Sequence, residues 1–514
     1  MNKTIISTLL GVAFITTLSS CESFLNEQNP NSIPVDTYFQ TQNDVERAVN
    51  GAYESLRSGY CMGEGSMAYV EERSDNTGRL DNQSAAGEPF QFTDFSLLPS
   101  NTYMKRRWNA LFEAVNNANF AIKGAQEVEF SDDTKRANLE AEARFVRALV
   151  NFDLVRTWGD IPLVSEYLMT PAEIKEHTFR APQSQVYDLI VEDLKFGLEK
   201  SSVANHNSVG TRGRASKAAM SALLGKVYLT MAHVLDAGSR EQNLRNAVKY
   251  LTQCYDMRKF GSLSEISYDD DPGTGLYAVE NKSTCPEIIF QIVYIRGDKD
   301  YHSSIARNSQ SKGINVNSQN KANGNGTFVN PDLVKEYEPT DPRKAFSVTY
   351  APSSHSWNIT KYRDKSDEAG VLGYGGNDWI ILRYADVILM LAEAYEGLGD
   401  QARAISYLDQ VRARAGVVPY ATAMLNPEYS QKYPTLKMAI LHERRVELAF
   451  ENQRWYDLLR FFTPSELVTY MHSKNQDDYG ISNLKNFTLK DIYFPIPYDE
   501  WKLNPKKMYQ NKGY

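Results

Sequence analysis

Apolar residues return every three or four positions along most of this chain, and that spacing predicts a mainly helical protein. The pattern is strongest in three segments, at about 134–158, 216–235 and 380–398. Trp158-Gly159-Asp160-Ile161-Pro162 should end the first of them, because a glycine followed by a proline seldom continues a helix. Near the N-terminus, Thr41 or Asn43 is suited to cap a further amphipathic helix.

The helix at 380–398 is followed by a second one after Gly399-Asp400, and the pair covers about 32 residues. The connecting segment, Ala394 to Asp400, resembles the turn of a tetratricopeptide repeat. Helix pairs of this size bury their apolar faces by stacking on neighbouring pairs. Because the pairs are not contiguous along the chain, we expect a tetratricopeptide-like helical scaffold with large inserts and a few short strands.

Two long stretches lose the helical period and should form loops on this scaffold. The first, about 58–107, is rich in Gly, Asn, Ser and Asp. The second, about 261–378, holds two apolar segments that predict strands, at 288–294 and 346–350, with an asparagine-rich stretch between them. Long irregular segments on a rigid scaffold usually carry function. We therefore expect the ligand-facing side of the protein in these two stretches.

The N-terminus has the features of a bacterial lipoprotein signal. Lys3 precedes an apolar run, from Ile5 to Leu18, that is too short to cross a bilayer as a mature helix. The run ends in Leu18-Ser19-Ser20-Cys21, which resembles a lipobox, so Cys21 should carry the lipid. A plain secretory signal that happens to end near a cysteine is the alternative. The predicted parts are a signal peptide at 1–20, a lipidated tether at 21–40 and a body at 41–514.

Composition narrows the function further. The chain is 42% hydrophobic and 23% charged, as in a soluble globular protein. Its net charge is -8 and no block of Lys or Arg stands out, so nucleic acid is not an expected partner. Beyond Cys21 only Cys61, Cys254 and Cys285 remain, which allows one disulfide at most.

A series of short motifs, in a fixed order, extends over almost the whole chain. The most distinctive are Ile381-Leu382-Arg383-Tyr384-Ala385-Asp386-Val387 and Glu443-Arg444-Arg445-Val446-Glu447-Leu448. The others are residues 21–25, the helix at 108–122 with Asn116, Ala118 and Asn119, and residues 143–148, 158–162, 218–228, 454–460, 494–497, 503–505 and 513–514. Together they resemble the SusD/RagB outer-membrane lipoproteins of nutrient uptake. Asn452-Gln453 departs from the family, because many members carry a glycine there. Asn tolerates the left-handed conformation, so the turn should survive.

The resemblance implies a lipid-anchored protein at the cell surface, on the outer membrane. It also implies a partner, a TonB-dependent barrel of the SusC type, over which the lipoprotein sits as a hinged lid. The lid would capture an oligosaccharide and close it into the barrel. Two alternatives remain open. One is a peptide importer of the RagB type, and the other is a surface lipoprotein with no role in transport.

The chain lacks the motifs of common catalytic sites. No HExxH, GxSxG, Walker A or GxGxxG pattern occurs, and no His/Cys cluster has zinc spacing. We expect no enzyme, although two well-placed carboxylates would be enough for a glycosidase. Five charged residues lie within apolar helices, and we interpret them as buried ion pairs that fix helix register. They are Arg383, Asp386, Glu443, Arg444 and Glu447.

Sugar capture needs flat aromatic rings that stack on pyranose faces and planar polar groups that match pairs of hydroxyls. Both are present in the two loop stretches, where the family resemblance also points. The candidates are Tyr69, Arg73, Asp75, Asn76 and Arg79 in the first, and Tyr301, His302, Trp357, Tyr374 and Trp379 in the second.

Trp357 is the strongest single candidate, because it lies in the polar context His355-Ser356-Trp357-Asn358, where core packing explains it least. The alternative is a tryptophan that holds a loop in place. Trp379 opens an apolar helix, which favours packing, and Arg73 and Asp75 could equally form a structural pair.

The acidic turn Asp269-Asp270-Asp271-Pro272-Gly273 could hold a structural calcium ion, since calcium prefers several hard oxygen ligands on a turn. A solvated acidic turn is the alternative that we favour. No other cofactor is expected.

Overall fold

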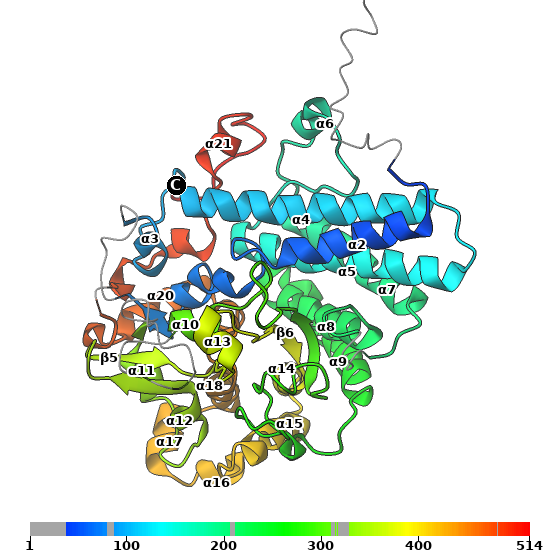
Figure 1. Cartoon of the computed structure of the whole chain (residues 1–514). Helices are drawn as coiled ribbons and strands as arrows, with labels where there is room; N and C mark the ends of the chain where they lie inside the picture. The colour runs from blue at the N-terminus through cyan, green and yellow to red at the C-terminus, as the bar shows by residue number, and fades with distance from the viewer. Residues whose placement is uncertain are drawn as a thin grey trace, which may run out of the picture.

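The computed structural model describes residues 38–79, 87–205, 211–309, 314, 316, 328–480 and 482–514. Helices dominate this part of the chain, as predicted (Figure 1). The predicted signal peptide, Cys21 and the tether up to residue 37 lie outside the described residues. Among the residues described, no helix combines the length and apolarity that crossing a membrane requires.

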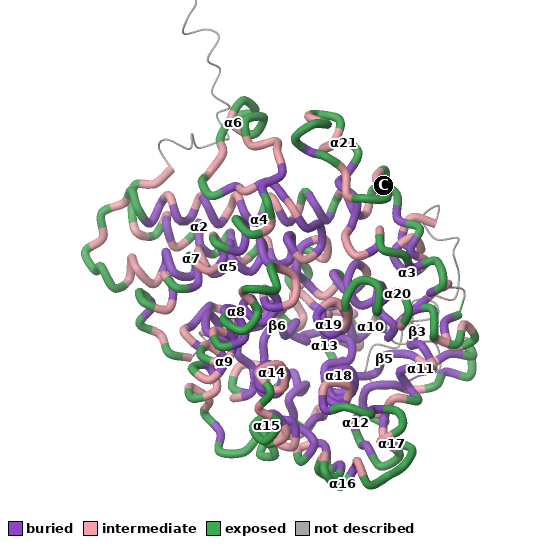
Figure 2. The backbone as a smooth tube through the Cα atoms, turned by 180° about the vertical axis from the view of Figure 1, so that it is seen from behind, coloured by how far each residue is buried: buried purple, intermediate pink, exposed green. Residues whose placement is uncertain are grey.

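Long helices form the scaffold. They are α2 (Gln42–Leu56), α4 (Thr102–Glu127), α5 (Asp133–Trp158), α7 (Gln183–Lys200), α8 (Lys217–Val234), α9 (Arg240–Asp256), α14 (Tyr384–Gly397), α15 (Gln401–Arg414), α18 (Leu436–Glu447), α19 (Arg454–Phe461) and α20 (Pro464–Ser473). Consecutive helices pack as pairs: α4 on α5, α8 on α9, and α14 on α15. In addition, α2 packs on α4, α5 on α7, and α14 on α9, so the pairs stack into one body. Figure 2 shows that the buried residues follow these stacked helices through the interior.

Short helices lie in the connections. They are α3 (Phe90–Thr93), α6 (Pro171–Glu176), α10 (Ile305–Ser309), α11 (Pro331–Val334), α12 (Arg343–Ser347), α13 (Asp367–Leu372), α16 (Tyr420–Ala423), α17 (Pro427–Lys432) and α21 (Tyr498–Trp501). The 3-10 helices η2 (Glu64–Ala68) and η3 (Glu71–Arg73) occupy part of the first irregular stretch.

The predicted helix ends are confirmed where a local signal sets them. Thr41 caps α2 in a capping box with Asp44, whose carboxylate accepts from the Thr41 backbone N–H at 2.8 Å. Gly159 ends α5 in a conformation with φ of 75°, which a glycine adopts without steric cost. Asn452 has φ of 57°, so the turn between α18 and α19 keeps the left-handed residue that many relatives fill with glycine.

Two small antiparallel sheets lie in and beside the large insert. One has four strands in the order β1 (Thr77–Gly78), β3 (Phe328–Val329), β5 (Ser356–Ile359) and β4 (Val348–Ala351). The other pairs β2 (Ile288–Ile292) with β6 (Trp379–Arg383). The strand predicted at 288–294 is therefore confirmed. The strand predicted at 346–350 starts two residues later, because α12 runs to Ser347.

The segment predicted as one helix at 380–398 begins as a strand. Residues Trp379–Arg383 form β6, and α14 starts only at Tyr384. Pairing with β2 explains the difference, since Ile380 lies opposite Gln291 and the Tyr384 N–H donates to the Glu287 carbonyl at 2.9 Å. The apolar run is the same in either conformation, and the strand partner lies about ninety residues earlier in the chain.

Candidate functional site

The four-stranded sheet brings the two predicted ligand stretches together. β1 ends the first stretch, β5 carries Trp357, and β3 lies between them. In the register of this sheet, Thr77 lies opposite Val329, and Val329 lies opposite Trp357. On the other side of β5, Trp357 lies opposite Tyr350 of β4. Residues that are directly opposite in antiparallel strands share one face, so these four side chains form a row across the sheet.

Trp357 and Tyr350 form the accessible end of this row. Their ring centroids are 5.6 Å apart with planes at 66°, and the Lys344 ammonium lies 6.0 Å from the Trp357 ring. Tyr350 is 44% exposed, whereas Trp357 is half-buried and packs partly against the core. The indole is therefore held in place on one side. Its remaining surface, with the phenol and the ammonium beside it, has the chemistry of a platform for a polar ring.

Three further candidates, Tyr301, His302 and Tyr374, form a second aromatic cluster. The His302 and Tyr374 rings lie 4.4 Å apart. Their segments are tied by a backbone pair in which Ser303 and Gly375 exchange N–H···O bonds of 2.8 and 3.0 Å. Tyr301 is 40% exposed, and the Arg57 guanidinium lies over its ring at 4.5 Å. The sequence candidates from 301–302 and 374 therefore do meet in space.

Glu64 is hydrogen-bonded to the two residues that follow His302. Its carboxylate accepts from the Ser304 N–H at 2.7 Å and from the Ser303 hydroxyl. Burial raises the pKa of Glu64 to about 7, because the hydrogen bonds from Ser303, Ser304 and Ile305 offset only part of the cost of desolvating the charge. Sequence reasoning missed Glu64, Arg57, Tyr350 and Lys344, since nothing local marks them as neighbours of the aromatic candidates.

For four candidates in the first stretch the predicted role as ligand contacts is wrong, because these side chains are buried in the core. Tyr69 is 4% exposed and packs edge-on against Phe92 at 5.1 Å. Arg73 is fully buried, with its guanidinium 4.6 Å from the Phe494 ring and a hydrogen bond to the Asp491 carbonyl.

Asp75 and Asn76 are the other two, and both are bound by arginines from α18 and α19. Asp75 pairs with Arg454 at 2.7 Å and with Arg445 at 3.2 Å. Burial opposes ionisation of Asp75, but the two guanidinium groups outweigh it and hold its pKa well below its usual range. The Arg445 Nε donates to the Asn76 amide oxygen at 2.9 Å. These polar groups therefore have structural partners and do not face a ligand.

Trp379 and Arg79 have different outcomes. Trp379 is 1% exposed on β6, and its ring lies 5.7 Å from that of Tyr362. The prediction that Trp379 contacts the ligand is therefore wrong, because this ring packs in the core. Arg79 follows β1, is half-buried and pairs with Glu72 at 2.8 Å. It remains a candidate beside the sheet.

The carboxylates of the acidic turn at 269–271 already have hydrogen-bond or ion-pair partners within the protein. Asp271 accepts from the backbone N–H groups of Gly273 and Thr274 at 2.9 and 3.0 Å. Asp269 accepts from the Ser267 hydroxyl at 2.7 Å, and Asp270 pairs with Lys365 at 2.7 Å. Calcium binding at this turn stays a prediction. Cys61, Cys254 and Cys285 are buried free thiols.

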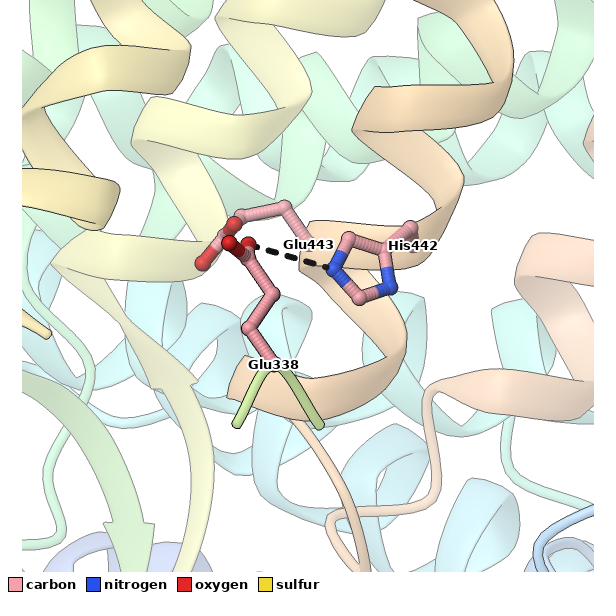
Figure 3. Close-up of side chains that lie close together, drawn as sticks. All are labelled: Glu338, His442 and Glu443. Atoms are coloured by element: carbon pink, nitrogen blue, oxygen red, sulfur yellow. Dashed lines mark ion pairs between the residues drawn. The ribbon is translucent and has the colours of Figure 1, made fainter. Parts of the chain in front are cut away.

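Charged residues of the family motifs form a buried network, as interpreted from the sequence. Arg383 pairs with Glu287, Glu447 and Glu451 at 2.6–2.8 Å, and Arg444 pairs with Asp386 at 2.9 Å. Within this network Glu338, His442 and Glu443 bring their ligand atoms within 4.8 Å of one another (Figure 3).

This trio is already neutralised by arginines. Arg412 pairs with Glu338 at 2.9 Å and with Glu443 at 3.0 Å, and Arg343 pairs with Glu443 at 2.7 Å. His442 contacts Glu336 at 3.1 Å through Nδ1 and stacks on the Tyr433 ring at 4.2 Å. Two guanidinium groups beside the carboxylates disfavour a metal cation, so the cluster is better explained as structural.

Comparison with known proteins gives concordant family matches. A model of the SusD family matches residues 344–514, and a model described as starch-binding and associating with the outer membrane matches residues 23–229. SusD-like protein P2 of Formosa agariphila is 26% identical, over 98% of this chain and 98% of its own length. A SusD-like protein of Bacteroides ovatus is 22% identical, over 91% of this chain and 85% of its own length.

Solved structures share the fold. A laminarin-binding SusD-like protein superposes with a TM-score of 0.71 at 22% identity, covering 93% of this chain and 100% of that one. Surface glycan-binding protein A from Bacteroides thetaiotaomicron, in complex with laminarihexaose, gives a TM-score of 0.72 at 18% identity, covering 92% of this chain and 100% of that one.

Proposed function

The chain belongs to the SusD-like family, and from this premise we propose that it is a cell-surface lipoprotein that captures an oligosaccharide for import. Cys21 would carry the lipid that holds it on the outer membrane. A TonB-dependent barrel of the SusC type would receive the glycan when the lipoprotein closes over it. The role is that of a binding protein, without catalysis.

The observation that carries glycan binding is the aromatic platform on β5 and β4. One side of the Trp357 ring packs against the core, which lowers the entropic cost of presenting its other side to a ligand. Tyr350 stands beside it, and the Lys344 ammonium can donate to hydroxyl groups. The laminarin-binding proteins of the same fold support an oligosaccharide as the ligand class.

The second cluster offers another ring surface for a chain of sugars. The Tyr301 ring is exposed and braced by Arg57, and His302 and Tyr374 lie beside it. An oligomer that contacts several separate rings gains affinity from each, which suits an extended glycan better than a single sugar. Both surfaces belong to the proposed ligand side.

A peptide is the second candidate ligand, and one feature of the sheet favours it. β4 is an edge strand of the four-stranded sheet among the described residues, and an extended peptide can add a strand to such an edge. We prefer a glycan because the exposed Tyr350 ring lies beside the half-buried Trp357 ring, and paired aromatic rings suit a sugar face.

Native affinity gels test the proposal. The mature protein would be run through gels that contain plant, host and microbial polysaccharides, including laminarin, while a casein digest is titrated by calorimetry. Retardation by one glycan class without peptide binding is the expected result. Peptide binding without retardation would overturn glycan capture in favour of the peptide importer. Co-purification of a large β-barrel in mild detergent would test the import role separately from the ligand.

A further inference from the structure

A large cavity lies among the long helices, apart from both predicted ligand stretches. Its volume is about 520 Å³, within the range of roughly 300–1,000 Å³ that is usual for small-molecule sites. The C-terminal ends of α5 and α8, together with α19 and the start of α20, form most of its wall (Figure 2). No lining residue comes from 58–107 or 261–378. The cavity is therefore separate from the aromatic platform on β4 and β5.

Much of the cavity wall is apolar. The apolar side chains in it include Val155, Val234, Leu235, Leu459, Phe462 and Leu467. Four of them, Val234, Leu235, Leu459 and Phe462, are only half-buried although they pack against the core. Covering such a wall with an apolar ligand removes apolar surface from water, which is favourable.

One charged side chain of the wall, Arg156, is held in place by aromatic rings. It is 10% exposed, and its guanidinium carbon lies 3.6 Å from the centre of the Tyr456 ring and 3.9 Å from that of Phe152. Its Nε donates to the Phe152 carbonyl at 3.1 Å. A guanidinium that lies over aromatic rings keeps the N–H donors at its edge for other partners. Arg156 is therefore oriented in advance for hydrogen bonds to an anion.

Asp153 is the only ion-pair partner of Arg156 among the described residues, and other groups already bind it. Asp153 Oδ1 lies 3.7 Å from Arg156 Nη2 and accepts from the Tyr456 hydroxyl at 2.9 Å. Asp153 Oδ2 accepts from the guanidinium of Arg107, which is 1% exposed. One buried carboxylate thus serves two guanidinium groups. Because a charge removed from water is costly unless it is paired, a further anion beside Arg156 is favoured.

The other charged residues of the wall do not supply that anion. They are Arg240, Arg460, Lys437 and Glu466, whose carboxylate caps α20. Arg460 pairs with Glu393 at 2.9 Å and with Asp457 at 2.7 Å, so its charge is already balanced. Arg240 is exposed and Lys437 is half-buried, so water solvates both cations. Arg156 is left as the nearly buried cation of the wall without a carboxylate of its own.

We propose that this cavity binds a small monoanion with an apolar body, a medium-chain carboxylate, whose carboxylate pairs with Arg156. A carboxylate matches two parallel N–H donors of a guanidinium, and its apolar chain would cover the apolar wall. Burial lowers the pKa of His233 to about 4, so near pH 7 this lining residue is neutral and adds no second positive charge. One unbalanced cation suits a single negative charge. The site does not depend on the proposed glycan function.

Calorimetric titration with octanoate tests this proposal on the mature protein, made without its lipid so that no detergent competes for the ligand. Octanol serves as the probe with the chain but no charge, and acetate as the probe with the charge but no chain. The expected result is one octanoate per protein, bound at least tenfold more tightly than octanol or acetate. Absence of saturable octanoate binding at millimolar concentrations would overturn the proposal, and so would equal affinity for octanol.

Two variants test the place of binding. Arg156→Gln removes the cation, whereas Ala237→Trp narrows the cavity from an exposed position of its wall and leaves Arg156 intact. Both should weaken octanoate binding at least tenfold. Since Ala237 is exposed, its variant should fold even if Arg156→Gln is unstable, and thermal unfolding without ligand checks both. Octanoate binding that persists in the folded Ala237→Trp variant would place the ligand elsewhere and overturn the proposal.

Two controls complete the design. Arg403→Gln is the matched control, because Arg403 also lies over a tyrosine ring, that of Tyr395 at 4.3 Å, but is 61% exposed on α15. This variant should bind octanoate as the wild type does, and an equal loss of binding there would contradict a specific role for Arg156. Ala237→Trp should still be retarded by glycan in affinity gels, which distinguishes failure of this site from failure of the proposed function.

Discussion

At the residue scale, the distinctive charges of this chain are structural. Arg383 shows this most clearly, because its guanidinium contacts three buried carboxylates and the Glu447 carbonyl. The surrounding arginines outweigh the cost of burial at Glu447 and hold its pKa below its ordinary value. Such a network fixes how β6, α18 and the chain before β2 fit together. Removing one cation from it leaves several buried anions without compensation.

Arg383→Ala should therefore lower the free energy of unfolding by about 3–5 kcal/mol, the usual cost of breaking a buried ion pair on one side. Urea denaturation would measure it. The control is Arg245→Ala, which removes an exposed pair with Glu241 whose side chains are 61% and 72% exposed. That change should cost less than about 1 kcal/mol. Equal effects of the two substitutions would contradict a structural role for Arg383.

Glu64 gives a pH-dependent expectation. Its pKa rises from an ordinary value near 4.5 to about 7 in the folded protein, because burial disfavours the charge. The folded state therefore holds a proton that the unfolded state has lost. Stability from this group is complete below about pH 4.5 and is lost as the pH rises through about 7.

The Glu64→Gln variant has no carboxylate at this position, so it does not lose stability there as the pH rises. The stability of the variant relative to the wild type should therefore rise between pH 5 and pH 8, by at most about 1.4 kcal/mol per pH unit. Urea denaturation of both proteins across this range measures the difference. A difference that stays constant with pH would show that Glu64 does not titrate as its burial requires.

At the element scale, local signals set some boundaries and distant contacts set others. Thr41 and Gly159 act within a few residues, and both helix ends follow from the sequence. β6 could not be recognised in this way. Its apolar run suits a helix or a strand equally, and only pairing with β2 decides between them.

The turn between α18 and α19 allows an element-scale test. Asn452 has φ of 57°, its N–H donates to Glu71 at 3.1 Å, and its amide donates to the Ser66 hydroxyl at 2.8 Å. Asn452→Val and Asn452→Gly both lose the amide contact, but only valine is strained in this conformation. The valine variant should be less stable than the glycine variant by about 1–2 kcal/mol in urea denaturation. Equal stabilities would mean that the backbone there relaxes without cost.

At the scale of the whole molecule, the two stretches predicted to form the ligand side meet through β1, β3 and β5. The sequence predicted the two stretches, but their meeting and the place of each residue in them depend on the fold. Asp75 and Asn76 look like surface residues in their local sequence. Their burial follows from Arg445 and Arg454, which lie more than 360 residues later and could be assigned to them only from the fold.

The same scale separates the proposed ligand side from the scaffold. The aromatic platform lies on β4 and β5, whereas the stacked long helices and their buried ion pairs form the body (Figure 1). The loops of the ligand side can therefore change while the stacked helices and their ion pairs remain.

The most direct test of this account is calorimetric titration of the mature protein with the glycan that retards it in affinity gels. Trp357→Ala should weaken binding at least tenfold, or about 1.4 kcal/mol, because the stacking surface is lost. The matched control is Tyr498→Ala on α21. Tyr498 is 51% exposed, and removing its ring should leave the affinity unchanged. An unchanged affinity in Trp357→Ala would contradict the central claim that the β5 platform binds the glycan.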